Sequence, residues 1–209
     1  MYPVSMSTVR SFRDPAPEPV RLEVRAADNL RFIRETMENA GRFTAVPGWG
    51  GVGMGVTALA AAVVATFQPA TGRWLAVWLA ELAVAVVIAA CATVLKARAA
   101  KVQVFSAAGR RFALSFVPPL LVGALLTIVL YRAGLMHVLP GMWLLLYGTA
   151  IVTGGAFSVR VVPVMGLCMM VTGAAALLAP AAWGNIFMAI GFGGLQIVFG
   201  AIIAHRHGG

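Results

Sequence analysis

Glu81 stands out chemically, because it is the only carboxylate within the long apolar stretches of the chain. No Asp or Glu follows it in the remaining sequence. Trp74 and Trp78 precede it at helical spacing, so in a helix the three side chains share one face. A charged side chain is costly inside a membrane, and an ionisable residue there is a candidate functional site. Proton transfer or ion coupling within these stretches would have to use Glu81.

Three other polar residues lie at a similar depth in their own apolar stretches. From the helical rise, Glu81 lies about 10 Å from the end of its stretch, Tyr147 and Thr172 roughly 9 Å, and Thr127 about 6 Å. These four residues form the predicted intramembrane polar site, and Arg132 is close enough to extend toward it. Glu81 could titrate there. Alternatively, a neutral Glu81 could hydrogen-bond Tyr147 or Thr127 and join two helices, or lie near enough to the surface to be hydrated.

Gln196 is a second deep polar side chain, about 12 Å from the other end of its stretch. It shares a helix face with Gly193, Gly200 and Ala204. Small residues allow helices to approach closely, and an amide can hydrogen-bond across such a contact. This pattern predicts a helix-packing role for Gln196.

The first apolar stretch carries small residues at four-residue spacing on two faces. One face has Gly51 and Gly55, and the other has Gly53, Thr57 and Ala61. Such small-xxx-small patterns are typical of helix–helix contacts in membranes. We therefore expect this stretch to be a close-packing surface, and it is also the candidate surface through which two copies of the chain could associate.

Neither a metal site nor an enzyme is predicted. A cluster of soft ligands could suggest copper, but core filling is the expected role of these residues: Met165, Cys168, Met169 and Met170. The sequence has no His-Glu-x-x-His motif and no phosphate-binding Gly-Lys-Ser/Thr loop. We expect a protein without cofactor, metal or catalytic residues.

The elements that would position these residues are membrane helices. Hydrophobic residues make up 60% of the chain and the mean hydropathy is +0.89, outside the range of ordinary soluble domains. Six stretches approach the roughly 20 residues needed to cross a bilayer. They cover residues 49–67, 74–95, 112–131, 142–157, 161–178 and 183–204. The sequence predicts an all-α, polytopic protein with six transmembrane helices in a lipid bilayer.

The distribution of basic residues predicts the orientation. With the N-terminus inside, 14 of the 16 Lys and Arg residues lie on the inner side, and only Arg73 and Arg132 lie outside. Basic residues near the ends of spans are retained in the cytoplasm, so both termini are predicted there, in a bacterial inner membrane. The same rule explains the net charge of +9, and no nucleic-acid partner is expected.

The segment before the first span divides into two parts. Residues 1–27 are rich in proline and charge and are predicted to be a disordered cytoplasmic tail. Residues 28–47 are predicted to contain an amphipathic helix that Asp28 caps and Gly41 ends. This helix could lie at the membrane interface, or residues 28–44 could bind a cytoplasmic partner protein. Residues 205–209 are predicted to be a short cytoplasmic tail.

The six spans show signs of a threefold repeat. Val-Pro pairs occur at 46–47, 117–118 and 162–163, and two of them close the similar runs FALSFVP and FSVRVVP. The occurrence of this element three times suggests duplication. We therefore expect three αα-hairpins of one orientation.

Residues 164–204 resemble the two-span repeat of HdeD-like acid-resistance membrane proteins. The shared features are a glycine-punctuated span, a Leu-x-x-Pro exit at 177–180, and a returning span with Gly191 and Gly200. The resemblance implies six spans built from three hairpins, and a non-enzymatic, stress-related membrane protein. A small transporter or channel that uses Glu81 as its titrating group is the alternative.

Overall fold

The computed structural model describes residues 28–31, 47–99, 107–156 and 158–207, in two compact units, 1–39 and 40–209. In the first unit, residues 28–31 are helical. They belong to the helix predicted over 28–47, most of which, like the tail predicted over 1–27, lies outside the described residues.

The second unit is a bundle of helices, and its described part contains no strand. Its elements are α2 (Gly48–Thr66), α3 (Thr71–Ala99), α4 (Ala107–Arg132), η1 (Met136–Val138), α5 (Leu139–Gly155), α6 (Val161–Leu178), η2 (Ala181–Trp183), α7 (Gly184–Met188), η3 (Ala189–Leu195) and α8 (Gln196–His207). Six helical segments of the described chain are long and apolar enough to cross a membrane. The predicted class, an all-α membrane protein with six spans, is confirmed.

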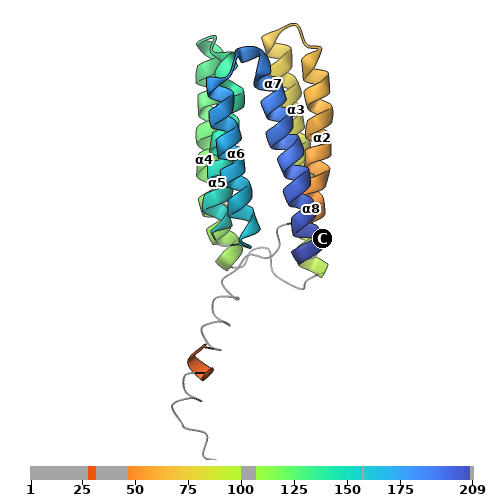
Figure 1. The fold of residues 1–209 in the computed structure, drawn as a ribbon, viewed down its shortest axis with the longest axis vertical. Helices are drawn as coiled ribbons and strands as arrows, with labels where there is room; N and C mark the ends of the chain where they lie inside the picture. Colours follow the sequence, from red (N-terminus) through yellow and green to blue (C-terminus); the bar gives the residue numbers. More distant parts are fainter. Residues whose placement is uncertain (1–27, 32–46, 100–106, 157, 208–209) are drawn as a thin grey trace, which may run out of the picture. The chain divides into compact units, whose positions relative to one another are not determined.

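The helices run up and down between two ends of the bundle (Figure 1). We call one the turn end, where residues 67–70, 133–135 and 179–180 connect successive helices. The other is the basic end, where six described Lys and Arg residues lie: Lys96, Arg98, Arg110, Arg111, Arg160 and Arg206. Arg73 and Arg132 are at the turn end.

The two spans of the first and second predicted hairpins pack against each other, but those of the third do not mainly do so. Figure 1 shows α4, α5 and α6 on one side of the bundle and α2, α3, α7 and α8 on the other. Helix α2 packs against α3 and α8, and α5 packs against α4 and α6. The two spans of the third predicted hairpin therefore have their main contacts with other helices, and the threefold repeat stays a prediction.

Glycines allow two of these helix pairs to approach closely. A Cβ atom added to Gly148 of α5 would lie 2.7 Å from the carbonyl oxygen of Gly166 on α6. A Cβ atom added to Gly166 would likewise lie 2.7 Å from the carbonyl oxygen of Gly148. Between α2 and α8, a Cβ on Gly51 would lie 3.2 Å from Cα of Gly200. Backbones this close leave no room for larger side chains at the contact.

The glycine faces of α2 are therefore occupied within the chain. Gly51 and Gly55 face α8 and η3, while Gly53 lies opposite Ile88 of α3 and Thr57 bonds Glu81. The close packing predicted for these faces is therefore with helices of the same chain. The association of two copies through this span stays a prediction.

Helices α3 and α4 leave most of their apolar surface exposed. Only 11% of the most apolar 18-residue window of either helix is buried. Leu82 and Val87 on α3 and Leu121 and Leu125 on α4 are 57–65% exposed. Apolar area on this scale is typical of a surface that lipid covers.

Two helices have irregular interiors. Helix α4 contains Pro118 and Pro119. Proline has no N–H, so Pro119 cannot make the helical hydrogen bond to the carbonyl of Ser115. The hydroxyl of Thr153 on α5 donates a 2.9 Å hydrogen bond to that oxygen instead. The sixth span, predicted as one regular helix, contains the π-helical segment η3. Helix α8 then continues to His207, so the tail predicted from residue 205 is helical as far as that residue.

The buried side chains form two clusters. The cluster nearer the turn end contains Ala58, Ala61, Ala62, Ala65, Trp78 and Met188. The second contains Ile151, Val162, Met165, Met169 and Ile203. Met165 and Met169, considered above as soft ligands, thus lie among apolar core residues.

Candidate functional site

The four residues predicted to form one polar site lie in separate contacts. Glu81 on α3 is half-buried and accepts a 2.8 Å hydrogen bond from the hydroxyl of Thr57 on α2. This bond joins two neighbouring helices. The recorded partner is thus Thr57, where we had expected Tyr147 or Thr127. Depth along a helix could not say which helix faces Glu81.

Thr127 and Thr172 make different contacts. Thr127 is buried; its hydroxyl accepts a 2.8 Å bond from Trp143 Nε1 of α5 and donates a 2.7 Å bond to the carbonyl of Gly123. It therefore joins α4 to α5. The Thr172 hydroxyl donates to the carbonyl of Cys168 in its own helix.

Tyr147 and Gln196, predicted in two different roles, contact each other. Gln196 is only 4% exposed, and its Nε2 donates a 2.8 Å hydrogen bond to the Tyr147 hydroxyl. The Tyr147 ring lies between the rings of Phe116 and Phe192, with centroids 6.0 and 5.2 Å away. This contact connects the two sides of the bundle through α5 and α8.

Asn185 of α7 is the polar residue that sequence reasoning missed. Its Nδ2 donates to the carbonyl of Ala62 at 2.7 Å and to the hydroxyl of Thr66 at 2.8 Å. Its Oδ1 accepts longer bonds from Trp74 Nε1 at 3.4 Å and Trp78 Nε1 at 3.3 Å. An amide has two N–H groups and an oxygen with two lone pairs, so all four positions are used. Asn185 therefore connects α7 to both α2 and α3.

Stacked indoles extend this connection to two more helices. The rings of Trp74 and Trp143 stack 5.9 Å apart at an interplanar angle of 10°. Because Trp143 also bonds Thr127, a continuous chain of contacts runs from α4 through α5 and α3 to Asn185. The sequence did contain a signal, since an amide within an apolar span needs partners that can hydrogen-bond it.

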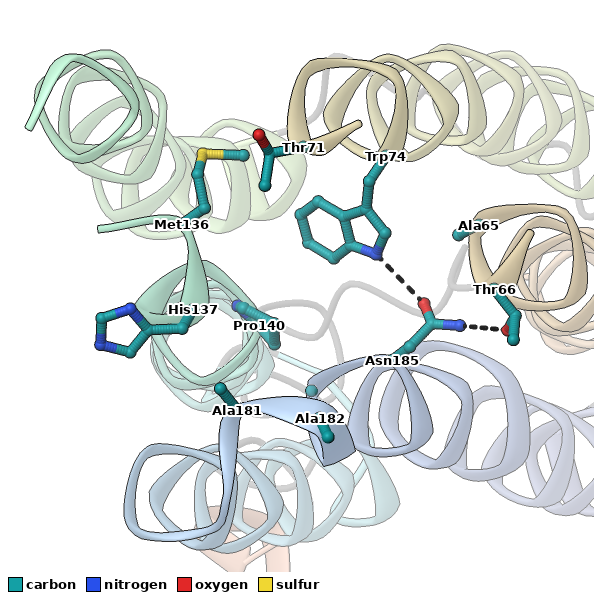
Figure 2. Close-up of a pocket in the computed structure, with 11 residues that line it drawn as sticks. Ala65, Thr66, Thr71, Trp74, Met136, His137, Pro140, Ala181, Ala182 and Asn185 are labelled. Atoms are coloured by element: carbon teal, nitrogen blue, oxygen red, sulfur yellow. Dashed lines mark hydrogen bonds between the residues drawn. The ribbon is translucent and has the colours of Figure 1, made fainter. Parts of the chain in front are cut away.

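A pocket opens beside these residues at the turn end. Its volume is about 360 Å³. Its lining comes from α2, α3, η1, α5, η2 and α7: Ala65, Thr66, Thr71, Trp74, Met136, His137, Pro140, Ala181, Ala182, Gly184 and Asn185. Figure 2 shows Trp74 and Asn185 directed toward each other at its side, while the His137 ring is turned away from both.

No family model matches the chain, and neither a curated protein nor a solved structure is significantly similar to it. The functional argument therefore depends on the geometry of the chain itself.

That geometry separates Glu81 from the pocket. Glu81 is not among the lining residues. Trp78 precedes it by three residues on the side nearer the pocket, and Trp78 is only 4% exposed. Within the described part of the chain, no three His, Cys, Asp or Glu side chains are grouped so that they could hold a metal ion. The polar contacts can hold neighbouring helices together, and the pocket at the turn end can bind a small molecule.

Proposed function

We propose that this integral membrane protein is non-enzymatic, lies in the bacterial inner membrane with the basic end in the cytoplasm, and contributes to tolerance of stress at the cell envelope. The observation that supports it most is that four polar side chains within the spans hydrogen-bond neighbouring helices: Glu81, Thr127, Asn185 and Gln196. Asn185 uses every position of its amide in this way. Such groups stabilise a bundle without providing a path for solute.

The charge distribution supports the proposed orientation. Six described Lys and Arg residues lie at the basic end and two at the turn end. Positive residues flanking membrane spans are retained on the cytoplasmic side. The stress-related role is proposed from the resemblance of residues 164–204 to HdeD-like proteins.

The contact with Thr57 is compatible with a neutral, structural Glu81, because a hydroxyl can accept a hydrogen bond as well as donate one. Thr57 Oγ1 lies 2.8 Å from Glu81 Oε1, and also 3.0 Å from the carbonyl of Met54 and 3.3 Å from that of Gly53. A hydroxyl has one hydrogen, so it can donate fully to only one of the three. If Thr57 donates to its own helix, a protonated Glu81 can donate to Thr57. An uncharged carboxyl also avoids the cost of a charge in hydrocarbon.

A transporter or channel that uses Glu81 is the competing function. It requires water or a solute to reach the carboxyl and requires that carboxyl to change its charge. The pocket does not include Glu81, so a path for water or a solute would have to continue from the pocket to the Glu81 carboxyl.

A complementation experiment distinguishes the two functions. A strain that lacks the gene should survive acid challenge less well than its parent, and the wild-type chain should restore survival. Glu81→Gln should restore it equally, because a neutral amide can replace a protonated carboxyl. Unimpaired survival of the deletion strain under acid and other envelope stresses would contradict the stress role. A Glu81→Gln chain that reaches the membrane but does not complement would favour the transporter.

A further inference from the structure

The pocket at the turn end has no part in the proposed function. We propose that it binds a small organic anion with an aromatic body, for which benzoate is the simplest probe. Its volume of about 360 Å³ lies at the small end of the range of ligand pockets, roughly 300–1,000 Å³.

The aromatic side of the pocket is preformed. Trp74 stacks on Trp143, and its Nε1 bonds Asn185 at 3.4 Å. Asn185 is itself held by Ala62 and Thr66. A ligand would therefore meet an indole that is already fixed in place (Figure 2), and binding would order few side chains. Preorganisation of this kind raises affinity because little conformational entropy is lost.

The polar groups of the lining favour an apolar body for the ligand. All four positions of the Asn185 amide are used, and the Thr66 hydroxyl both donates to Ala62 and accepts from Asn185. Buried polar atoms of a ligand next to Asn185 and Thr66 would find few partners and would lose their hydration. The opposite side carries small residues that leave space for a ring: Pro140, Ala181, Ala182 and Gly184.

The charges near the pocket favour an anion over a cation. Arg73 directly precedes Trp74, and Arg132 lies four residues before Met136. The chain has no acidic residue after Glu81, which is outside the lining. Positive charge with no carboxylate in the described lining attracts anions and repels cations. A ligand with its carboxylate at the mouth of the pocket and its aromatic ring against Trp74 would match both the positive charge and the apolar lining.

Fluorine NMR of the whole chain, labelled with 5-fluorotryptophan in nanodiscs of zwitterionic lipid, tests this proposal. The Trp74 resonance is assigned by its loss in Trp74→Phe, and Trp49, at the basic end, reports nonspecific partitioning into the bilayer. Benzoate, benzyl alcohol and benzylammonium share one ring and differ in charge. We expect benzoate to shift the Trp74 resonance saturably while leaving Trp49 unchanged. Benzylammonium should bind roughly tenfold more weakly at low ionic strength, and added salt should narrow the difference.

Two variants locate the binding site. Ala182 and Ala133 are both exposed at the turn end, but only Ala182 lines the pocket. Ala182→Phe should weaken benzoate binding at least about tenfold by filling the space, while Ala133→Phe should not change it. Equal shifts at Trp74 and Trp49, or an unchanged affinity in Ala182→Phe, would overturn the site. Benzyl alcohol or benzylammonium binding as tightly as benzoate would overturn the preference for an anion. None of these results depends on the role proposed for Glu81 or on the stress phenotype.

Discussion

Replacing Asn185 by Leu should destabilise the bundle more than any other single polar substitution at the turn end. Leu has the same branching and the same number of side-chain heavy atoms, so the change removes the hydrogen bonds and adds only the extra bulk of two methyl groups. Two of the lost bonds are short, 2.7 Å to Ala62 and 2.8 Å to Thr66. Polar contacts between membrane helices contribute about 0.6 kcal/mol on average and up to about 1.7 kcal/mol each.

The two remaining bonds add a smaller amount. Those from Trp74 and Trp78 are 3.4 and 3.3 Å long, beyond the usual range for N–H···O bonds. Trp78 is nevertheless buried, and a buried donor that loses its partner costs roughly 1 kcal/mol or more. The carbonyl of Ala62 keeps its 2.8 Å bond from Thr66. The expected loss in the free energy of unfolding is therefore about 2–3 kcal/mol.

Unfolding by sodium dodecyl sulfate in mixed micelles, followed by circular dichroism, measures this loss. Gln68→Leu is the matched control, because the Gln68 amide is also at the turn end but bonds only the carbonyl of Val64 in the preceding helix α2. It should cost less than about 0.5 kcal/mol. In a double-mutant cycle, Asn185→Leu and Thr66→Val should show a coupling of about 0.6–1.7 kcal/mol. A cost for Asn185→Leu no larger than that for Gln68→Leu would refute the role assigned to Asn185.

Three further outcomes are expected. Glu81→Gln should leave the thermal unfolding temperature unchanged, whereas Glu81→Leu should lower the free energy of unfolding by about 1–2 kcal/mol. Equal losses of stability in both variants would contradict a neutral, hydrogen-bonding Glu81. Trp78 fluorescence of the reconstituted protein should not change between about pH 4 and 8, and a change that Glu81→Gln abolishes would identify Glu81 as a titrating group. Gly166→Ala should lower the free energy of unfolding by about 1–3 kcal/mol, because the new Cβ would lie 2.7 Å from the Gly148 carbonyl. Gly194→Ala should be tolerated, because its Cβ would have no neighbour closer than 4.0 Å. Equal stability of the two variants would contradict the close α5–α6 contact.

The number and positions of the spans could be predicted because hydropathy is a local property. Each predicted span overlaps a helix that is long and apolar enough to cross a membrane. The ends differed most at α3, which runs from Thr71 to Ala99, and at α4, which begins at Ala107. Both helices extend into polar and basic residues, where hydropathy falls but helical hydrogen bonds continue.

The contacts between spans could not be predicted in the same way. Glycine patterns on the first span correctly indicated close packing, but a pattern on one helix does not say which helix meets it. Gly51 meets Gly200 of the same chain. Equally, Glu81 and Tyr147 have similar depths but face different helices, and their recorded partners are Thr57 and Gln196.

Asn185 could not be identified by its depth, because it lies near the start of the predicted sixth span, 183–204, whereas the other candidate polar residues lie deeper in their spans. An uncharged amide can satisfy four partners at once, and indole N–H groups can only donate. Trp74 and Trp78 on one helix face were therefore a pair of donors that required an acceptor on another helix.

Cysteine accessibility in cells tests the central claim most directly: six membrane spans with the basic end in the cytoplasm. Cys91 and Cys168 are first replaced by alanine, and single cysteines are then placed at Ala70 and Ala133 at the turn end and at Ala99 at the basic end, all exposed in the structure. A membrane-impermeant maleimide should label the first two in intact spheroplasts and should label Ala99→Cys only after the membrane is permeabilised. Labelling of Ala99→Cys in intact spheroplasts, with Ala70→Cys and Ala133→Cys protected, would contradict the orientation. Labelling of all three cysteines in intact spheroplasts would place both ends of the bundle outside and would contradict six complete spans.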